Sequence, residues 1–394
     1  MNSIFFLVLR RMRAPLIVLI VIYAVSVLGL TLVPGVDANG QLAPPLSFFH
    51  AFYFISYTAT TIGFGEIPNA FSDAQRLWVT VCIYLTVVGW SYSIVTLLAL
   101  FQDKAFQNVL VVGRFARRVR HLHEPFYLVC GCGETGALVC RTLDALNIRF
   151  VVVEAREERV QELDLEDFKT DVPALAADAL APKVLEMAGL RHAKCLGVLA
   201  LTNDDNVNLA IAISTRLLNP GLTVLARAEN SMTAANMASF GTHHIVNPFE
   251  RFGDYLGLAL KAPHTIRLMG WVTGLPGRPM SPMQRPPSGA WVVCGHGRFS
   301  QPVIRSLAGN DLQVTVITPE PAGTVVPPLR HIAGLGVCAD TLIEAGVAGA
   351  VGLVAGTDND VNNLSIAVTA KEMNPDLFVV LRQNRISNAP LFEA

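Results

Sequence analysis

The chain has 394 residues, of which 52% are hydrophobic and 15% are charged, and its formal net charge is -1. It is too long for one ordinary domain and more apolar than most soluble proteins. The near-zero net charge gives no support to nucleic-acid binding, so the local distribution of charge matters instead. The seven cysteines form no CxxC pair and no Cys/His cluster, which argues against a zinc ribbon or a disulfide framework.

Two long apolar runs indicate membrane spans. Pro15 to Leu32 contains no charged residue, and Leu77 to Phe101 contains no acid or base. Both runs have about the length, roughly 20 helical residues, that crosses a lipid bilayer. A secretory signal peptide is the alternative for the first run, but the run is long for that role and shows no small-residue cleavage site. Basic residues gather before the first run and after the second, which predicts that both termini are cytoplasmic.

A shorter apolar stretch, Ser47 to Thr58, lies between the two runs and suits a re-entrant helix. It leads into the sequence Thr61-Ile62-Gly63-Phe64-Gly65-Glu66. Non-helical backbone at membrane depth is tolerated only where it lines a water-filled path or is buried in protein. A helix followed by a Gly-punctuated strand therefore predicts a pore. The alternative for these few residues alone is an ordinary Gly-containing loop.

The pattern Thr-x-Gly-aromatic-Gly is typical of a potassium selectivity filter. Copies of this strand point backbone carbonyl oxygens at a central axis, where the oxygens replace the hydration shell of the ion. The glycines permit backbone angles that a Cβ would penalise. We expect K⁺ to bind at Thr61, Ile62, Gly63 and Phe64. Glu66 is expected just outside the narrowest part, where its negative charge would favour cations.

The rest of the chain alternates between strands and helices. A basic linker, residues 104–124, precedes the first of several short apolar strands, and a Gly-rich turn follows that strand. This order predicts a parallel, doubly wound α/β sheet of the Rossmann type. The expected elements are a helix at Ala137 to Leu146 and strands at Phe126 to Cys130, Phe150 to Val153, Cys195 to Leu201 and Thr223 to Ala226.

The Gly-rich turn is a candidate dinucleotide-binding motif because it follows a strand and precedes a helix. The first glycine allows a tight turn, the second lets the backbone approach a pyrophosphate, and the third lets the helix pack on the strand. Glu154 ends the next strand, where it can accept hydrogen bonds from ribose hydroxyls; a surface acid is the alternative. Arg227 ends a later strand and could meet phosphate or form a structural ion pair. The candidate residues are Gly131, Cys132, Gly133, Glu134, Thr135, Gly136, Glu154, Ala155, Asp178, Ala179, Thr202, Asn203 and Arg227.

The α/β region is a repeat of one unit. The stretch 202–212 resembles 357–367, and Asn-Pro pairs follow both at the same spacing. The second Gly-rich turn departs from the motif, because Ser300 replaces the third glycine, which leaves a structural or ion-binding role for it. Residues 263–288, rich in Pro, Gly and Met, look like an irregular connector. The second copy ends early, so either this lobe is short or the chain is a fragment.

The apolar runs and the filter sequence resemble the two-transmembrane potassium channels, and the repeated lobes resemble tandem RCK domains, the regulators of potassium conductance. The resemblance implies a pore domain at 1–103, a first lobe at 125–262 that binds NAD or another adenine nucleotide, and a second lobe at 289–394. It also implies a homotetramer in the cell (inner) membrane with an eight-lobed cytoplasmic gating ring, regulated by nucleotide or by a cation such as Ca²⁺. Gly89 stands where such channels carry a gating hinge, with helix packing as the alternative. Phe64 replaces the family's more common Tyr.

Two other functions share parts of this pattern. The lobes have the fold of NAD-dependent oxidoreductases, so a membrane-anchored enzyme is one alternative, but no substrate domain and no convincing acid or base accompany the cofactor motif. A subunit of a potassium uptake transporter is the other, and the fused filter argues against it. The sequence therefore favours a channel without enzymatic activity.

Overall fold

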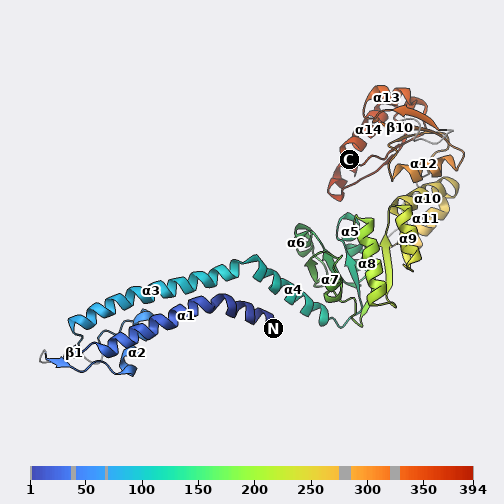
Figure 1. Cartoon of the computed structure of the whole chain (residues 1–394). Coiled ribbons are helices and arrows are strands. Elements are labelled where there is room, and N and C mark those ends of the chain that lie inside the picture. The colour runs from blue at the N-terminus through green and yellow to red at the C-terminus, as the bar shows by residue number, and fades with distance from the viewer. Residues whose placement is uncertain (1, 37–40, 67–69, 275–284, 320–328, 394) are drawn as a thin grey trace. The chain divides into compact units, whose positions relative to one another are not determined.

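The structure is a computed structural model that describes residues 2–36, 41–66, 70–274, 285–319 and 329–393. It divides into two compact units, Met1–Arg114 and Phe115–Ala394. The first unit holds the expected pore segments, and the second holds both α/β lobes (Figure 1).

The first unit is helical. Helix α1 spans Asn2–Leu32, α2 spans Phe48–Ala59 and α3 spans Asp73–Gln102. Helix α1 packs along α3, and the short α2 packs against both (Figure 1). Strands β1 (Gly35–Val36) and β2 (Leu42–Ala43) form a small antiparallel pair between α1 and α2. A separate short helix therefore lies between two long ones where the re-entrant helix was expected, and its re-entry into the membrane stays a prediction.

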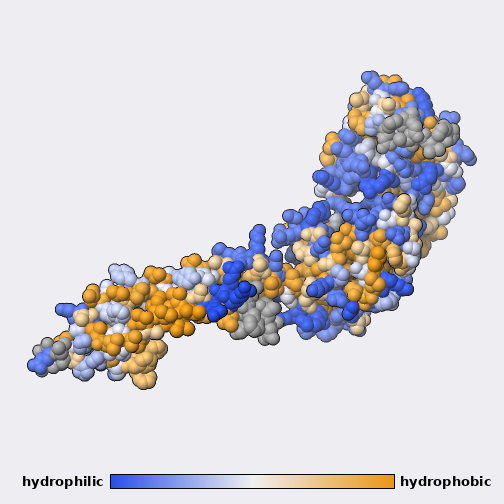
Figure 2. Space-filling view, viewed as in Figure 1, coloured by the Kyte–Doolittle hydropathy of each residue, from blue (hydrophilic) through white to orange (hydrophobic). Residues whose placement is uncertain are grey.

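Helices α1 and α3 have the length and composition of membrane spans. The segments Val8–Leu32 and Asp73–Gln102 are long and apolar enough to cross a bilayer, and they overlap both predicted runs. Only 22% of the most apolar stretch of each helix is buried within the structure. Figure 2 shows apolar side chains covering much of the visible surface of this unit. Exposed apolar surface of this extent indicates contact with lipid or with other protein chains.

The expected linker contains a helix. Helix α4 spans Lys104–Arg120 and begins directly after Asp103, whose side chain accepts a hydrogen bond from the Ala105 N–H at 2.8 Å. The boundary between the two units falls within α4. Phe115 and Val119, on its second half, are buried in the second unit. An amphipathic helix buries such residues on one face, so most of the expected basic linker is helical.

The first lobe is a doubly wound sheet of six parallel strands in the order β5-β4-β3-β6-β7-β8. This confirms the predicted fold class, and the four predicted strands match β3, β4, β6 and β7. The strands are β3 (Phe126–Cys130), β4 (Arg149–Glu154), β5 (Ala174–Ala176), β6 (Cys195–Ala200), β7 (Thr223–Arg227) and β8 (His244–Val246). The helices are α5 (Glu134–Ala145), α6 (Glu157–Leu165), α7 (Pro182–Met187), α8 (Asp205–Leu218) and α9 (Ser231–Ser239).

The second lobe repeats the same winding with five parallel strands in the order β11-β10-β9-β12-β13. A partner for the sixth strand, β8, is missing among the described residues of this lobe. The strands are β9 (Ala290–Cys294), β10 (Gln313–Thr318), β11 (Arg330–Ala333), β12 (Gly352–Ala355) and β13 (Phe378–Leu381). The helices are α12 (Ser300–Ala308), α13 (Ala339–Glu344), α14 (Asp360–Met373) and α15 (Ala389–Glu393), with 3₁₀ turns η2 (Val347–Gly349) and η3 (Ile386–Asn388).

The repeat is confirmed by matching hydrogen bonds. The side-chain amide of Asn208 donates to the carbonyls of Thr202 and Arg227 at 3.0 and 2.9 Å. In the second lobe, Asn363 donates to the carbonyls of Thr357 and Arg382 at 3.0 and 2.8 Å. Each buried asparagine thus ties together the ends of two neighbouring strands, which satisfies carbonyls that the sheet leaves unpaired.

Helices α10 (Pro248–Lys261) and α11 (Pro263–Val272) join the lobes. A Cβ at Gly253 of α10 would lie 2.9 Å from the Pro302 backbone of α12, so the two helices approach closely. Glu250 and Arg305 form an ion pair of 2.9 Å across the same contact. The expected irregular connector is therefore helical in its first part, Pro263–Val272; residues 275–284 lie outside the described ranges.

Candidate functional site

The filter segment has the backbone that its glycines predict. Positive φ values alternate along it: 66° at Thr61, 65° at Gly63 and 90° at Gly65. Alternation of this kind lets successive carbonyl groups point to one side of the strand. A Cβ on Gly63 or Gly65 would meet no atom within 4 Å, so the two glycines are needed for conformation and not for close packing. Thr61 adopts the unfavourable φ with a β-branched side chain, a marker of local strain.

Tyr57 on α2 holds this segment in place. Its backbone carbonyl accepts hydrogen bonds from the N–H groups of Ile62 and Gly63, and its hydroxyl donates to the Gly65 carbonyl at 2.5 Å. The Tyr57 and Phe64 rings also meet edge to face, with centroids 5.3 Å apart. One buried residue of the pore helix therefore contacts both ends of the strand. Apart from the aromatic content of α2, nothing in the sequence indicates this role.

Glu66 has a fixed partner. Its carboxylate accepts hydrogen bonds from Arg76 Nε at 2.8 Å, from Arg76 Nη2 at 3.1 Å and from the Phe71 N–H at 2.9 Å. Arg76 therefore supplies a counter-charge beside Glu66, and the expected role of Glu66 in favouring cations stays a prediction. The pair connects the outer end of the filter to the first turn of α3.

Gly89 lies where α3 contacts α1. A Cβ there would lie 2.6 Å from Ile22 Cδ1 and 3.4 Å from Leu19 Cδ2. The residue belongs to one continuous helix, Asp73–Gln102. This geometry gives Gly89 a packing role of the kind common between membrane helices. Its role as a gating hinge stays a prediction.

The glycines of the turn after β3 have distinct environments. Gly131 has φ 92°, and a Cβ on it would lie 2.7 Å from the Thr202 backbone. A Cβ on Gly136 would lie 2.1 Å from the Gly131 carbonyl oxygen, so α5 packs tightly on the turn. A Cβ on Gly133 would meet its first neighbour, Asn203, only at 3.7 Å. Gly133 therefore faces open space at the start of α5, where a phosphate would bind.

Glu154 closes the base of this open space. Its side chain is buried and accepts hydrogen bonds from the backbone N–H groups of Cys132 at 2.5 Å and of Arg156 at 3.0 Å. These contacts exclude the alternative of a plain surface acid. Each carboxylate oxygen has further acceptor capacity, so the group can still bind ribose hydroxyls.

A cavity of about 360 Å³ lies at this edge of the sheet. It has the size of a small-molecule site. Eight of the thirteen predicted residues line it, together with four that the sequence analysis had not selected. The predicted members are Gly131, Gly133, Glu154, Ala155, Asp178, Ala179, Thr202 and Asn203, and the additional ones are Val153, Arg156, Asp204 and Val207.

The sequence held a signal for two of the missed residues. Arg156 follows Glu154 by two positions in the same loop, and Asp204 belongs to the repeated polar run after β6. Asp204 also caps α8, because its side chain accepts hydrogen bonds from the N–H groups of Asn206 and Val207. Val207 gave no signal, since an apolar residue on the first turn of a helix is ordinary.

Five predicted residues do not line this cavity: Cys132, Glu134, Thr135, Gly136 and Arg227. Glu134 instead forms an ion pair of 2.8 Å with Arg159. Arg227 donates to Asn203 Oδ1 at 2.7 Å and forms an ion pair with Glu229. Two roles were expected for Arg227, contact with phosphate or a structural ion pair, and the structure shows the ion pair.

The second Gly-rich turn differs in geometry from the first. Helix α12 begins at Ser300, five residues after Gly295, whereas α5 begins three residues after Gly131. The intervening Phe299 packs against Phe249 and Phe252 of α10, with ring centroids 6.1 and 5.1 Å away. The later helix start and the packing of Phe299 on α10 set this turn apart from the first one, although a Cβ on Gly297 would likewise meet no atom within 4 Å. Close helix packing itself is kept, because Ser300 is fully buried and donates to the Gly356 carbonyl at 3.2 Å.

Within the described residues, no group of three or more His, Cys, Asp or Glu side chains is placed to hold a metal ion. The described part of the chain therefore offers no preformed carboxylate cage for Ca²⁺.

Comparison with protein families matches two parts of the chain. A family of TrkA-N domains matches residues 127–248 and 291–394, more than half of the chain, and a family of ion channels matches residues 16–103. The chain belongs to the TrkA-N domain family. The two TrkA-N matches coincide with the two lobes, and the ion-channel match contains α2, the filter segment and both apolar helices.

Individual relatives agree with this division. Potassium channel protein 1 of Methanocaldococcus jannaschii is 26% identical over 203 residues, which is 51% of this chain and 59% of that protein. The chain thus spans less than two thirds of the length of this relative. The fold resembles two solved structures of the GsuK channel. For the one bound to ADP, the TM-score is 0.52 at 19% identity, with 99% of this chain and 93% of that chain covered. For the one bound to NAD, it is 0.53 at 17% identity, with 99% and 80% covered.

Proposed function

We propose that the chain is a subunit of a potassium-selective channel that is opened or closed by a cytoplasmic adenine nucleotide. The observation that carries this proposal is the filter segment. It lies between two apolar helices, it has alternating positive φ at Thr61, Gly63 and Gly65, and Tyr57 anchors it from the pore helix. The ion-channel family match over residues 16–103 supports the same reading.

The pore helix contributes to cation binding through its direction. Helix α2 ends at Ala59, two residues before Thr61, so its carboxyl end faces the inner end of the filter. The carbonyl end of a helix carries a partial negative charge of about half an elementary charge. This charge stabilises a cation near Thr61, while the backbone carbonyls of Thr61 to Phe64 replace the hydration shell of K⁺.

A conducting pore requires several copies of the chain. Gly63 and Gly65 border open space, and the large side chains of Ile62 and Phe64 are more than half exposed, at 59% and 57%. Neighbouring subunits would cover these surfaces in a homotetramer, with eight lobes forming a gating ring. The basic residues in the first part of α1 and on α4 favour a cytoplasmic position for both termini in the cell membrane.

The regulatory ligand is proposed to bind in the cavity at the first Gly-rich turn. Glu154 would bind the ribose and the start of α5 at Gly133 would bind phosphate, a combination suited to NAD or an adenosine phosphate. A ligand moves the gating equilibrium only through its different affinity for the two ring shapes. The first lobe of each subunit would supply this site.

Reconstitution in planar bilayers tests the channel. With a potassium gradient across the bilayer and sodium balancing the charge, the reversal potential should follow the potassium Nernst potential. A reversal potential that ignores the potassium gradient would overturn the assignment. Calorimetry with ADP and NAD on the purified full-length protein tests the regulatory site separately, because pore function does not depend on that result.

A further inference from the structure

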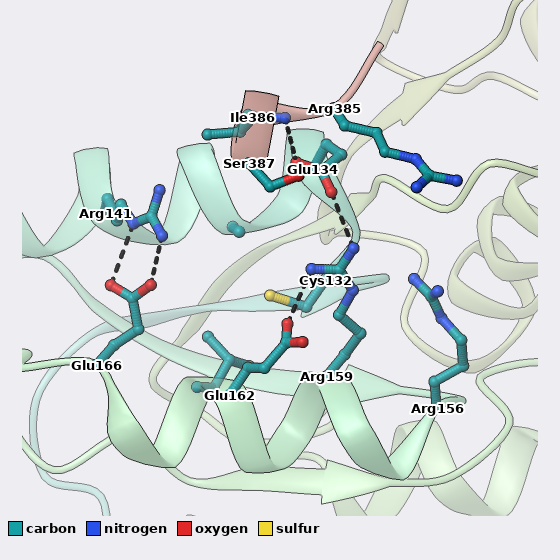
Figure 3. Close-up of a pocket in the computed structure, with 12 residues that line it drawn as sticks. Cys132, Glu134, Arg141, Arg156, Arg159, Glu162, Glu166, Arg385, Ile386 and Ser387 are labelled. Carbon is teal, nitrogen blue, oxygen red and sulfur yellow. Dashed lines mark hydrogen bonds and ion pairs between the residues drawn. The ribbon is translucent and has the colours of Figure 1, made fainter. Parts of the chain in front are cut away.

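A second cavity, of about 610 Å³, lies between the two lobes. Helices α5 and α6 of the first lobe line one side, and Arg385, Ile386 and Ser387 of the second lobe line the other (Figure 3). The lobes touch here directly, because the Ile386 N–H donates to Glu134 Oε2 at 3.0 Å. Glu134 is the first residue of α5, so this contact lies beside the expected phosphate position.

Four arginines line the cavity, and two of them are committed to ion pairs. Arg141 is held by Glu166, and Arg159 is held by Glu134 and Glu162 at 2.8 Å each. The other two are Arg156 and Arg385. They extend to the same side of the Glu134–Arg159 pair in Figure 3.

Arg156 and Arg385 have spare capacity for an anion. The ion-pair contact of Arg156 is Glu154, 3.6 Å away, and that carboxylate already accepts two backbone N–H groups. Arg385 forms no side-chain ion pair within the described ranges; its backbone N–H bonds Asp360 at 3.1 Å. Guanidinium groups are preferred ligands for phosphate, and of these two only that of Arg156 has a carboxylate within ion-pair distance among the described residues.

The two cavities share Arg156, which lines both. A Cβ on Gly133 would lie 4.0 Å from Arg156 Nη2, so this guanidinium stands at the point where the helix start faces the nucleotide cavity. A nucleotide with its ribose at Glu154 and its first phosphate at Gly133 directs its remaining phosphates past Arg156. They then enter the cavity that Arg385 lines.

We propose that the interlobe cavity is the subsite for the distal phosphates of the nucleotide, and that Arg385 of the second lobe binds them while the first lobe binds the nucleoside. This inference rests on the proposed nucleotide site. It assigns the ligand class as a nucleoside diphosphate or larger, because a nucleoside or a monophosphate ends before the subsite. It also gives the ligand a direct contact with both lobes, and hence a means to change their spacing.

Calorimetry on the full-length channel tests the subsite, with adenosine, AMP and ADP as probes. Replacement of the exposed Arg385 (R385A) should weaken ADP binding at least tenfold, change AMP binding much less and leave adenosine binding unchanged. The conservative variant R385K should recover part of the ADP affinity. Arg251→Ala, an exposed arginine of α10 that lines neither cavity, is the matched control and should bind all three ligands as the wild type does.

Two results would overturn the proposal while leaving nucleotide regulation intact: ADP affinity that is the same in R385A and wild type, or equal losses for ADP and adenosine. If wild-type protein binds none of the three ligands, the nucleotide site itself is wrong, and the subsite with it. Thermal unfolding of each variant shows whether the fold is kept.

Discussion

Arg298 Nη1 lies 2.5 Å from Glu229 Oε2, which joins the second Gly-rich turn to the end of β7 in the first lobe. The side chain of Glu229 is only 7% exposed and also pairs with Arg227, which in turn bonds Asn203 of the nucleotide cavity. The second turn therefore serves as a contact between the lobes.

Replacing Arg298 and replacing Glu229 should lower the stability of the protein by unequal amounts. Arg298 is 67% exposed, so R298A should cost about 1 kcal/mol or less of unfolding free energy. Glu229→Ala should cost about 3–5 kcal/mol, because it leaves the mostly buried Arg227 without its counter-charge. Denaturant unfolding of the full-length protein in detergent measures both. Equal effects would contradict a cluster centred on Glu229.

The Glu66–Arg76 pair should make the pore tolerant of acid on its outer side. Hydrogen bonds from Arg76 and from the Phe71 N–H lower the pKa of Glu66 below its ordinary value of 4.5. A depressed carboxylate pKa contributes stability that is present above the ordinary value and lost as the pH falls through the depressed one. Bilayer currents should therefore stay steady as the pH falls from neutral to 4.5, and should decline only at a lower pH. Glu66→Gln should conduct poorly at every pH, and normal conduction by this variant would refute the role of the pair.

Loss of the Tyr57 hydroxyl should loosen the filter. Tyr57→Phe removes the hydrogen bond to the Gly65 carbonyl while keeping the ring contact with Phe64. We expect about 1 kcal/mol of lost stabilisation of the conducting filter and a lower ratio of potassium to sodium permeability. Tyr53→Phe, an exposed tyrosine on the same helix, is the control. Reversal potentials under mixed-ion conditions measure the ratio, and identical ratios in both variants would exclude the anchor.

Alanine substitutions at two glycines of the first turn should affect different properties: Gly136→Ala the stability of the protein and Gly133→Ala its ligand binding. Gly136→Ala places a Cβ against the Gly131 carbonyl and should cost about 1–3 kcal/mol of unfolding free energy. Gly133→Ala has room for its Cβ and φ of -72°, so the protein should fold normally. The new methyl group nevertheless faces the cavity and should weaken ADP binding, as calorimetry can measure. If Gly133→Ala binds ADP as well as the wild type does, the phosphate does not bind at the start of α5.

Substitutions at Gly89 can distinguish a helix-packing role from a role as a gating hinge. Gly89→Ala should impair the channel because its Cβ meets Ile22 Cδ1 at 2.6 Å. If the defect comes from packing, Ile22→Val, which removes that atom, should restore single-channel activity in the double variant. A double variant that stays impaired would favour the hinge. Stability of the proposed tetramer in detergent separates assembly defects from gating defects.

Local backbone requirements made much of this protein predictable. Glycines at alternate filter positions and at Gly131 mark φ values that other residues rarely adopt, and such needs are visible in a single sequence. Strands buried in a parallel sheet appear as short apolar runs, so β3, β4, β6 and β7 could be located closely. The repeated polar run after β6 and β12 exposed the duplication, because each copy needs an asparagine to tie two strand ends together.

Partner choice between distant residues was decided only by tertiary structure. From the sequence alone, Glu66 could be an unpaired charge or one member of an ion pair. Only the fold brings Arg76 next to Glu66. The same holds for Glu134. Its position in the sequence places it in the phosphate-binding motif, but its side chain forms an ion pair with Arg159 and accepts a hydrogen bond from the Ile386 N–H. Pairing energies depend on distance and burial in three dimensions, which sequence separation does not encode. The filter and the first turn could therefore be recognised in the sequence, whereas the later helix start at the second turn and the cavity between the lobes required the structure.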